Sequence, residues 1–488
     1  MSRSRLSRRP LVRAGLLAAA AVAVVALAPS GIASAPGHAS GDRLCAPSRG
    51  TVAHRPGGRI VPQRTPARVP CASRTGFYTG ETGIAVTGDG TVWFSAANWE
   101  HALVRSKDNG HSWEALTPGG PQAMPGCYVA TSPMTCQDTE SAKNNTVADA
   151  YLYADPATSK VFWSKTYGFA VCSSLSMTPD NGRSWQSTTS FGCPGGDYEK
   201  IAAGPPPPGG DQPVGYPDVV YGCTNGPAPW FVVGPGRVCY KSLDGGASFT
   251  STGAPVTPSP LAPGCLQFQE AQVVARDGTL YVPLSCVDNP TGVRVRVARS
   301  TDEGMTWSYS AVPTGEVGSK AGAIGGGVSM AVDRAGAVYV VWRGNDDRAY
   351  LAVSKDKGAT WRGPMMVSMP GVTTALGPVP QVAAREPGHI AIGYYGYTKD
   401  AARISGYLTE SFDAAAASPL FHSAALNDPR HPLYFPTAGG SLPRNDYLGV
   451  AIGPDGTPWV GLVALTSAKP DAEGFIPSTG FAGRLTTP

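Results

Sequence analysis

The chain has 488 residues, of which 61 are glycine, 46 are proline and 15% are charged. This length exceeds what one hydrophobic core usually supports, so it indicates several domains or one architecture that grows by repetition. The composition is typical of short strands joined by tight turns, and the net charge of +4 falls to −1 without the five arginines of residues 1–13, which gives no sign of nucleic-acid binding.

Residues 1–35 have the pattern of a secretory signal peptide. Five arginines without an acid precede the apolar run AGLLAAAAVAVVALA, and the small residues GIASA follow it, which places cleavage at roughly residues 33–39. The apolar run is short for a membrane span, which needs about 20 residues. The string SRRPLV leaves twin-arginine export open as an alternative route. We expect a secreted, soluble mature chain without a membrane span.

The ten cysteines all follow this segment, and an even number in an exported protein indicates disulfides. No CxxC string occurs and the seven histidines are scattered, so we expect neither a metal site nor a cofactor. The spacing favours pairing between neighbours. The expected pairs are Cys45–Cys71, Cys127–Cys136, Cys172–Cys193, Cys223–Cys239 and Cys265–Cys286.

An eight-residue string recurs five times along the chain. The copies are SKDNGHSW (106–113), TPDNGRSW (178–185), SLDGGASF (242–249), STDEGMTW (300–307) and SKDKGATW (354–361). Asp can accept backbone N–H bonds from the residues that follow, Gly can take a positive φ, and the final Trp or Phe can anchor the next strand. Each copy therefore predicts a turn that satisfies its own polar groups.

A second pattern alternates with these copies and predicts seven hairpins. Each consists of two apolar segments around a short turn, which is a strong hairpin signal where the turn is Asp-Gly. The hairpins are expected at 83–94, 148–163, 201–222, 271–282, 329–340, 380–395 and 448–460.

The S-x-D-x-G-x-T/S-W string resembles the Asp-box, or bacterial neuraminidase repeat, of sialidases and related β-propellers. The resemblance covers roughly residues 80–488 and implies an all-β fold, a single propeller of four-stranded antiparallel blades. Seven hairpins favour seven blades, with six as the alternative. Residues 36–79 are an N-terminal extension that can close the last blade, with GGRIVPQ (57–63) as the partner for GFAGRLT (480–486).

In the family that this string resembles, the Asp-boxes lie on the face away from the active site. We therefore expect a structural and not a catalytic role for the five aspartates Asp108, Asp180, Asp244, Asp302 and Asp356. Function is then expected on the opposite face, where acids precede or begin the inner strands and aromatic residues stand beside charges in the loops. The alternatives are acids that only line a hydrated channel and rings that only fill gaps between blades. The catalytic candidates are Glu81, Asp149, Glu199, Glu270 and Asp446. The substrate-binding candidates are Trp99, Tyr167, Trp230, Arg343, Tyr395 and Arg444.

The resemblance implies a glycoside hydrolase similar to exo-α-sialidases that acts on extracellular glycans. However, such an enzyme is expected to show an Arg-Ile-Pro string, three arginines on the substrate carboxylate and a Tyr–Glu pair. The nearest string here, RIVP (59–62), has an inserted Val and lies far before Glu81, and the full catalytic pattern is missing. A non-catalytic propeller that binds glycans or proteins, and a structural wall-associated protein, stay open as alternatives. We expect a monomer.

Overall fold

The computed structural model describes residues 43–46, 49–63, 67–96, 103–116, 127–128, 135–136, 147–167, 172–191, 197–225, 236–256, 265, 271–288, 292–317, 327–375, 377–437, 448–470 and 476–487. The chain divides into two compact units, Met1–Gly41 and Asp42–Pro488, and the described residues belong to the second. The expected signal peptide at 1–35 lies outside the described residues. Within the described ranges, no helix has the length and apolarity needed to cross a membrane.

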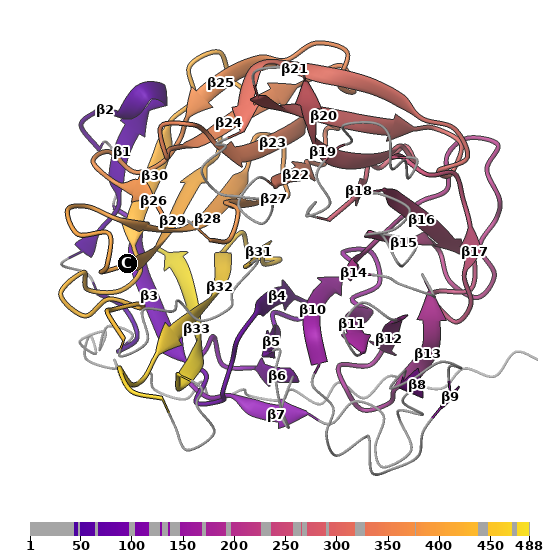
Figure 1. Ribbon diagram of the computed structural model, residues 1–488, viewed down its shortest axis with the longest axis horizontal. Helices are drawn as coiled ribbons and strands as arrows, with labels where there is room; N and C mark the ends of the chain where they lie inside the picture. The colour runs from indigo at the N-terminus through magenta and orange to yellow at the C-terminus, as the bar shows by residue number, and fades with distance from the viewer. Residues whose placement is uncertain are drawn as a thin grey trace, which may run out of the picture. The chain divides into compact units, whose positions relative to one another are not determined.

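The described part is all-β, with one short 3-10 helix, η2 (Pro56–Gly58), among the strands. Six four-stranded antiparallel sheets have a propeller arrangement (Figure 1). The first is β4 (Thr82–Val86), β5 (Val92–Ala96), β6 (Leu103–Ser106) and β7 (Glu114–Leu116). The second is β10 (Val147–Ala154), β11 (Val161–Tyr167), β12 (Cys172–Thr178) and β13 (Gln186–Phe191). The third is β14 (Asp197–Gly204), β15 (Val219–Asn225), β16 (Arg237–Ser242) and β17 (Thr250–Ser251).

The fourth sheet is β18 (Val273–Val274), β19 (Leu280–Asp288), β20 (Gly292–Ser300) and β21 (Ser308–Val317). The fifth is β22 (Val328–Val332), β23 (Val338–Arg343), β24 (Ala349–Ser354) and β25 (Arg362–Met366). The remaining four-stranded sheet is numbered seventh, because the seven-stranded sixth sheet comes before it along the ring. It consists of β31 (Gly449–Ile452), β32 (Pro458–Leu465), β33 (Ser478–Thr486) and β3 (Val69–Arg74). A separate pair is formed by β8 (Cys127–Tyr128) and β9 (Thr135–Cys136).

The sixth sheet has seven strands. Its strands are β27 (Gln381–Ala384), β28 (Ile390–Tyr397), β29 (Ser405–Ser411), β30 (Phe421–Ala425), β26 (Thr373–Thr374), β1 (Val52–Arg55) and β2 (Arg59–Ile60). All seven predicted hairpins are present as antiparallel pairs. The hairpin at 380–395 lies in this larger sheet and not in a four-stranded blade, because β1 joins β30 and extends the sheet outward.

The inner strands of successive sheets contact one another around a ring. β4 contacts β10, and the contacts continue through β14, β18, β22, β27 and β31 back to β4. The apolar core is accordingly divided among the spaces between neighbouring sheets. One such cluster joins the first and second sheets through Trp93, Leu152 and Trp163, and another joins the sixth and seventh through Leu408 and Leu462.

An N-terminal segment does pair with β33, but the prediction that residues 57–63 form this closing strand was wrong. The partner of β33 is β3, with Arg74 opposite Phe481 and Val69 opposite Thr486. Residues Arg59 and Ile60 of the RIVP string instead form β2 at the outer edge of the sixth sheet, where the Ile60 side chain is 64% exposed. Both segments can form an edge strand, but residues 69–74 bury Val69 and Cys71, whereas both residues of β2 stay exposed.

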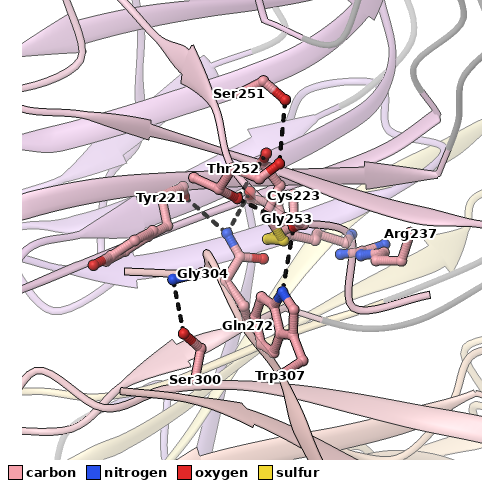
Figure 2. The surroundings of a disulfide bond; sticks show 12 residues. Tyr221, Cys223, Arg237, Ser251, Thr252, Gly253, Gln272, Ser300, Gly304 and Trp307 are labelled. Atoms are coloured by element: carbon pink, nitrogen blue, oxygen red, sulfur yellow. Dashed lines mark hydrogen bonds between the residues drawn. A yellow bond between two sulfur atoms is a disulfide. The ribbon is translucent and has the colours of Figure 1, made fainter. Parts of the chain in front are cut away.

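Three of the expected disulfides are present: Cys45–Cys71, Cys223–Cys239 and Cys265–Cys286. Cys127 and Cys136 are directly opposite one another in β8 and β9. Cys193 lies outside the described residues. Around Cys223, the Gln272 side chain donates to the carbonyl of Tyr221 (2.8 Å) and the Trp307 indole donates to that of Gly253 (3.3 Å), so polar contacts tie the fourth sheet to the third (Figure 2).

Candidate functional site

The Asp-box turns form the hydrogen bonds expected from the sequence. In the fifth copy, the Ser354 hydroxyl donates to Asp356 Oδ1 (2.8 Å) and accepts from the N–H of Gly358 (2.7 Å). Asp356 also accepts from the backbone N–H (2.8 Å) and hydroxyl (2.5 Å) of Thr360. The donors from Thr360 and Ser354 lower the pKa of Asp356 to about 2.

The same bonds recur in the other four copies, at Asp108, Asp180, Asp244 and Asp302. The glycine at the fifth position has a positive φ in each copy, as in Gly358 (84°). A residue without a Cβ adopts this backbone conformation without strain. The carboxylate oxygens of the five aspartates therefore accept hydrogen bonds from within their own turns.

A sixth Asp-box-like turn was missed by the sequence analysis. In the connection from β29 to β30, the Ser411 hydroxyl donates to Asp413 Oδ1 (3.1 Å), and Asp413 accepts from the N–H of Leu420 (2.7 Å). The available signal was the Ser-x-Asp start of SFDAAAASPL, but the glycine and the final Trp are absent.

The connections of each sheet divide between two ends. Strands within a sheet are antiparallel, so the turn between its first and second strands and the Asp-box turn lie at one end, which we call the Asp-box face. The loop between the second and third strands and the connection to the next sheet lie at the other end, the loop face. Because the Asp-box face is occupied by self-satisfied turns, the loop face is the better candidate for function.

Three of the predicted catalytic acids lie at the loop-face ends of consecutive inner strands. Glu81 directly precedes β4, Asp149 is in β10 and Glu199 is in β14. The pairing of β10 with β11 shifts register between Ala148 and Tyr151, and that of β14 with β15 shifts between Asp197 and Lys200. Asp149 is the first and Glu199 the second residue within such an irregularity, which re-aims backbone and side chains at strand ends.

Glu81 and Glu199 are both buried, and the Ser164 hydroxyl donates to the carbonyl of Glu199 (3.0 Å). The structure places these two acids at inner strands on either side of β10. It describes the strand position of Asp149 but not its side chain, and the predicted acids Glu270 and Asp446 lie outside the described residues.

Two buried lysines near this end were not predicted as site residues. Lys165 of β11 is fully buried, with Nζ 2.8 Å from the Ser176 hydroxyl and 3.7 Å from the centre of the Trp163 ring. Burial lowers the pKa of Lys165 well below its ordinary value. Lys200, next to Glu199, lies 4.8 Å from the centre of the Tyr151 ring. The available signal for Lys165 was its place inside the strand VFWSKTY, two positions after the apolar run VFW. A strongly perturbed group such as Lys165 is of the kind enriched at functional sites.

Arg343 ends β23 at the loop face and is buried, with 2% of the residue exposed. Its Nη1 lies 2.8 Å from Asp347 Oδ1, while its buried Nη2 has no hydrogen-bond partner among the described residues. Burial lowers the pKa of the guanidinium and the Asp347 carboxylate opposes this change. Arg343 therefore keeps an unused donor at the end where binding was predicted.

The predicted binding residue Tyr395 is buried between the sixth and seventh sheets. Its hydroxyl accepts from the N–H of Val463 (2.7 Å), and its ring meets Tyr434 edge-on with centroids 5.4 Å apart. This is the position of a ring that fills the space between sheets. The side chain of Tyr167 is not described, and Trp99, Trp230 and Arg444 lie outside the described residues.

The described residues contain no group of three or more His, Cys, Asp or Glu side chains placed to hold a metal ion.

Comparisons with known proteins agree with the repeat found in the sequence. Residues 219–381, which run from the third sheet into the sixth, match the BNR repeat-like domain. No curated protein sequence matches the chain.

Several solved structures have a similar fold. A Dyadobacter fermentans protein of unknown function is 13% identical, with 86% of this chain and 99% of that chain covered and a TM-score of 0.42. The intramolecular trans-sialidase of Ruminococcus gnavus is 14% identical, with 85% and 95% covered and a TM-score of 0.40. The Aleuria aurantia lectin is 13% identical, with 68% and 92% covered and a TM-score of 0.39. These likenesses concern the fold alone.

Proposed function

We propose that this chain is a secreted Asp-box propeller that acts on extracellular glycans at its loop face as a glycoside hydrolase of the sialidase-like type. In this proposal residues 1–35 are the signal peptide, and the propeller has seven blades, because the seven-stranded sixth sheet counts as a blade: its inner strand β27 lies in the ring between β22 and β31. The three disulfides support an extracytoplasmic location.

The observation that carries the proposal is the row of acids Glu81, Asp149 and Glu199 at the entrances of three consecutive inner strands. Glycoside hydrolysis needs one carboxylic acid that protonates the leaving oxygen and a second group that stabilises the positive anomeric carbon or activates water. The row offers both, with Glu270 and Asp446 as further candidates. Arg343 is proposed to bind substrate hydroxyl or carboxylate groups through its unused Nη2.

A glycan-binding protein without catalysis is the second candidate. It is favoured by the burial of Glu81 and Glu199, because a catalytic acid must reach the glycosidic oxygen. In this case the loop-face aromatic residues, with Trp99, Tyr167 and Trp230 as the predicted members, retain the glycan and no bond is cleaved.

A panel of chromogenic glycosides, sialosides included, tests the proposal on the purified mature chain. If it is a hydrolase, changing Glu81 or Glu199 to Gln, or Asp149 to Asn, lowers turnover by orders of magnitude with thermal stability nearly unchanged. Asp356→Asn on the Asp-box face is the control, and it should leave the turnover of the folded fraction intact even though it weakens its turn. Hydrolysis that survives substitution of all five acids contradicts the catalytic assignment. Binding without any turnover supports the second candidate.

A further inference from the structure

The residue at the fourth position of an Asp-box turn can join its sheet to the preceding sheet of the ring. In the fourth copy, Glu303 accepts from the backbone N–H of Asp211 (2.7 Å), which lies in the connection from β14 to β15 of the third sheet. In the fifth copy, Lys357 Nζ lies 2.5 Å from Asp277 Oδ2 in the turn between β18 and β19 of the fourth sheet. The third copy has Gly245 here, which has no side chain to extend.

The first and second copies have asparagine at this position, and glycine follows it in both. The pairs are Asn109–Gly110 and Asn181–Gly182. Their backbones are alike, because φ is 56° at Asn109 and 60° at Asn181. In both turns the glycine N–H donates to the hydroxyl oxygen at the first position, at 2.8 and 2.7 Å. What separates the two pairs is therefore the contact of the asparagine side chain.

The first sheet holds the side chain of Asn181. Its Nδ2 donates to Asp89 Oδ2 (2.9 Å) and to Thr91 Oγ1 (2.9 Å), both in the segment that joins β4 to β5. The bond to the carboxylate must break before the amide can move, which lowers the share of free Asn181 side chains by about tenfold or more. Asn109, in contrast, is exposed, and its side chain has no hydrogen-bond partner among the residues that the structure describes.

A third asparagine, Asn225, also precedes a glycine in the sequence. Asn225 ends β15, is buried with 1% exposed, and accepts at Oδ1 from Arg237 Nη1 (3.1 Å). The glycine that follows it lies outside the described residues. Of the three asparagines, Asn109 is therefore the one whose side chain is exposed and unbonded.

An asparagine before a glycine can react with its own backbone. The glycine nitrogen loses its proton to base and attacks the side-chain carbon Cγ. The new N–Cγ bond replaces the bond from Cγ to the amide nitrogen, which takes up a proton and leaves as ammonia. Water then opens the cyclic imide at either carbonyl and gives aspartate or isoaspartate. Glycine favours the attack because it has no Cβ beside its nitrogen, and asparagine is among the thermolabile residues.

We propose that Asn109 is a site of spontaneous deamidation in the folded chain, and that its isoaspartate product weakens the contact between the first and seventh sheets. The first Asp-box turn lies at that contact. The Trp113 indole at its end donates to the Ser73 hydroxyl of β3 (3.2 Å), and a Cβ on Gly110 would lie 3.7 Å from the Trp459 ring of β32. Since β3 is the N-terminal strand that completes the seventh sheet, the turn lies where the ring is closed.

Isoaspartate lengthens the backbone of this turn by one atom. The N–H of Gly110 donates to Ser106 Oγ (2.8 Å), and the N–H of Ser112 donates to Asp108 Oδ1 (2.9 Å). Both bonds span position 109, so the added methylene moves each donor away from its acceptor. The new carboxylate also lies beside that of Asp108, and like charges repel. The product therefore weakens the turn that carries Trp113.

Peptide mapping of the folded mature chain, stored in mildly alkaline buffer, tests the site. Mass spectrometry follows the exchange of NH2 for OH in each peptide, and electron-transfer fragmentation separates isoaspartate from aspartate. The rate at Asn109 should exceed that at Asn181 by about tenfold or more, because the latter amide is held by a carboxylate. Asn225 should stay unmodified. Equal rates at Asn109 and Asn181, or no modification of Asn109, overturn the proposal.

The same chain unfolded in urea shows whether the structure causes this difference. Without the folded contacts, the three asparagines should deamidate at similar rates, since each then differs only in its sequence neighbours. If the unfolded chain keeps the folded ratio of Asn109 to Asn181, the difference comes from the sequence and the proposal fails. Asn109→Gly is the matched variant, because Gly245 already occupies the equivalent position with a φ of 69°. Its peptide should show no modification on storage.

Thermal unfolding of the stored protein tests the effect on ring closure. Stored wild type should contain a fraction that unfolds at a lower temperature and grows in step with isoaspartate, whereas stored Asn109→Gly should unfold as it does when fresh. Asn109→Asp has the new charge without the longer backbone, so it should lose less stability than the isoaspartate fraction. Isoaspartate at 109 without any fraction of lower stability would refute the effect on ring closure.

Discussion

Glu410 and His389 form a buried pair inside the sixth sheet, with Glu410 Oε1 2.9 Å from His389 Nε2. The other carboxylate oxygen of Glu410 lies 3.2 Å from Nε of Arg68, the residue that precedes β3. Glu410 is fully buried. One carboxylate therefore links the sixth sheet to the N-terminal segment that closes the seventh.

Glu410→Ala should lower the free energy of unfolding by about 3–5 kcal/mol, because it takes a fully buried carboxylate away from the partly buried Arg68 charge and the buried His389 ring. Denaturant unfolding of the full chain measures this. Glu386→Ala is the matched control, since Glu386 pairs with Arg334, both side chains are exposed, and such surface pairs contribute about 1 kcal/mol or less. Equal effects of the two substitutions would contradict the assigned role of Glu410.

We expect the folded chain to lose stability in mild acid because of His54. This residue of β1 is buried, with Nε2 2.8 Å from the Ser423 hydroxyl of β30, and burial lowers the pKa of His54 to about 4. The unfolded chain, with a pKa near 6.5, takes up the proton first, so the contribution is complete above about pH 6.5 and is lost as the pH falls toward 4. His54→Gln should show a weaker pH dependence of the unfolding free energy in this window. A pH dependence unchanged by the substitution would refute the prediction.

The Asp-box aspartates affect stability in a lower pH range than His54. Since the folded pKa of Asp356 is about 2, below its ordinary value of 3.8, its turn contributes stability above about pH 4 and loses it as the pH falls toward 2. Asp356→Asn should therefore destabilise the chain at pH 6 and have little effect at pH 2, as measured by thermal unfolding. A destabilisation that is the same at both pH values would show that the charge of Asp356 is not what holds the turn.

Trp361 tests the orientation of the sheets. The sequence predicts a buried ring, but the structure places it half-buried, packed beside the cluster of the fourth and fifth sheets, with Nε1 3.3 Å from the Ser310 hydroxyl. Trp361→Ala should cost less than the roughly 3–5 kcal/mol of a fully buried tryptophan. Glycan binding by the folded fraction should be unaltered. A fully stable variant that has lost binding would place function on the Asp-box face. Trp361→Phe, which keeps the ring contact, is the control.

The site was less predictable from sequence than the fold. The position of Glu81, Asp149 and Glu199 at the start of inner strands follows from where the predicted hairpins begin. The burial of Glu199 and Tyr395 does not, because it depends on how neighbouring sheets approach one another. The burial of Lys165 does not follow from hairpin positions either, because its ammonium group lies inside the sheet against Trp163.

The sequence by itself determined the seven hairpins and the five Asp-box turns, because each depends on contacts between residues a few positions apart. Ser354, Asp356, Gly358 and Thr360 satisfy one another within one turn. Only the tertiary structure decided which edge receives each N-terminal strand, since β3 pairs with β33 across more than 400 residues and any extended segment offers the same backbone groups. It alone brought Trp113 to Ser73, because the closure of the ring, and no local pattern, makes these two residues neighbours.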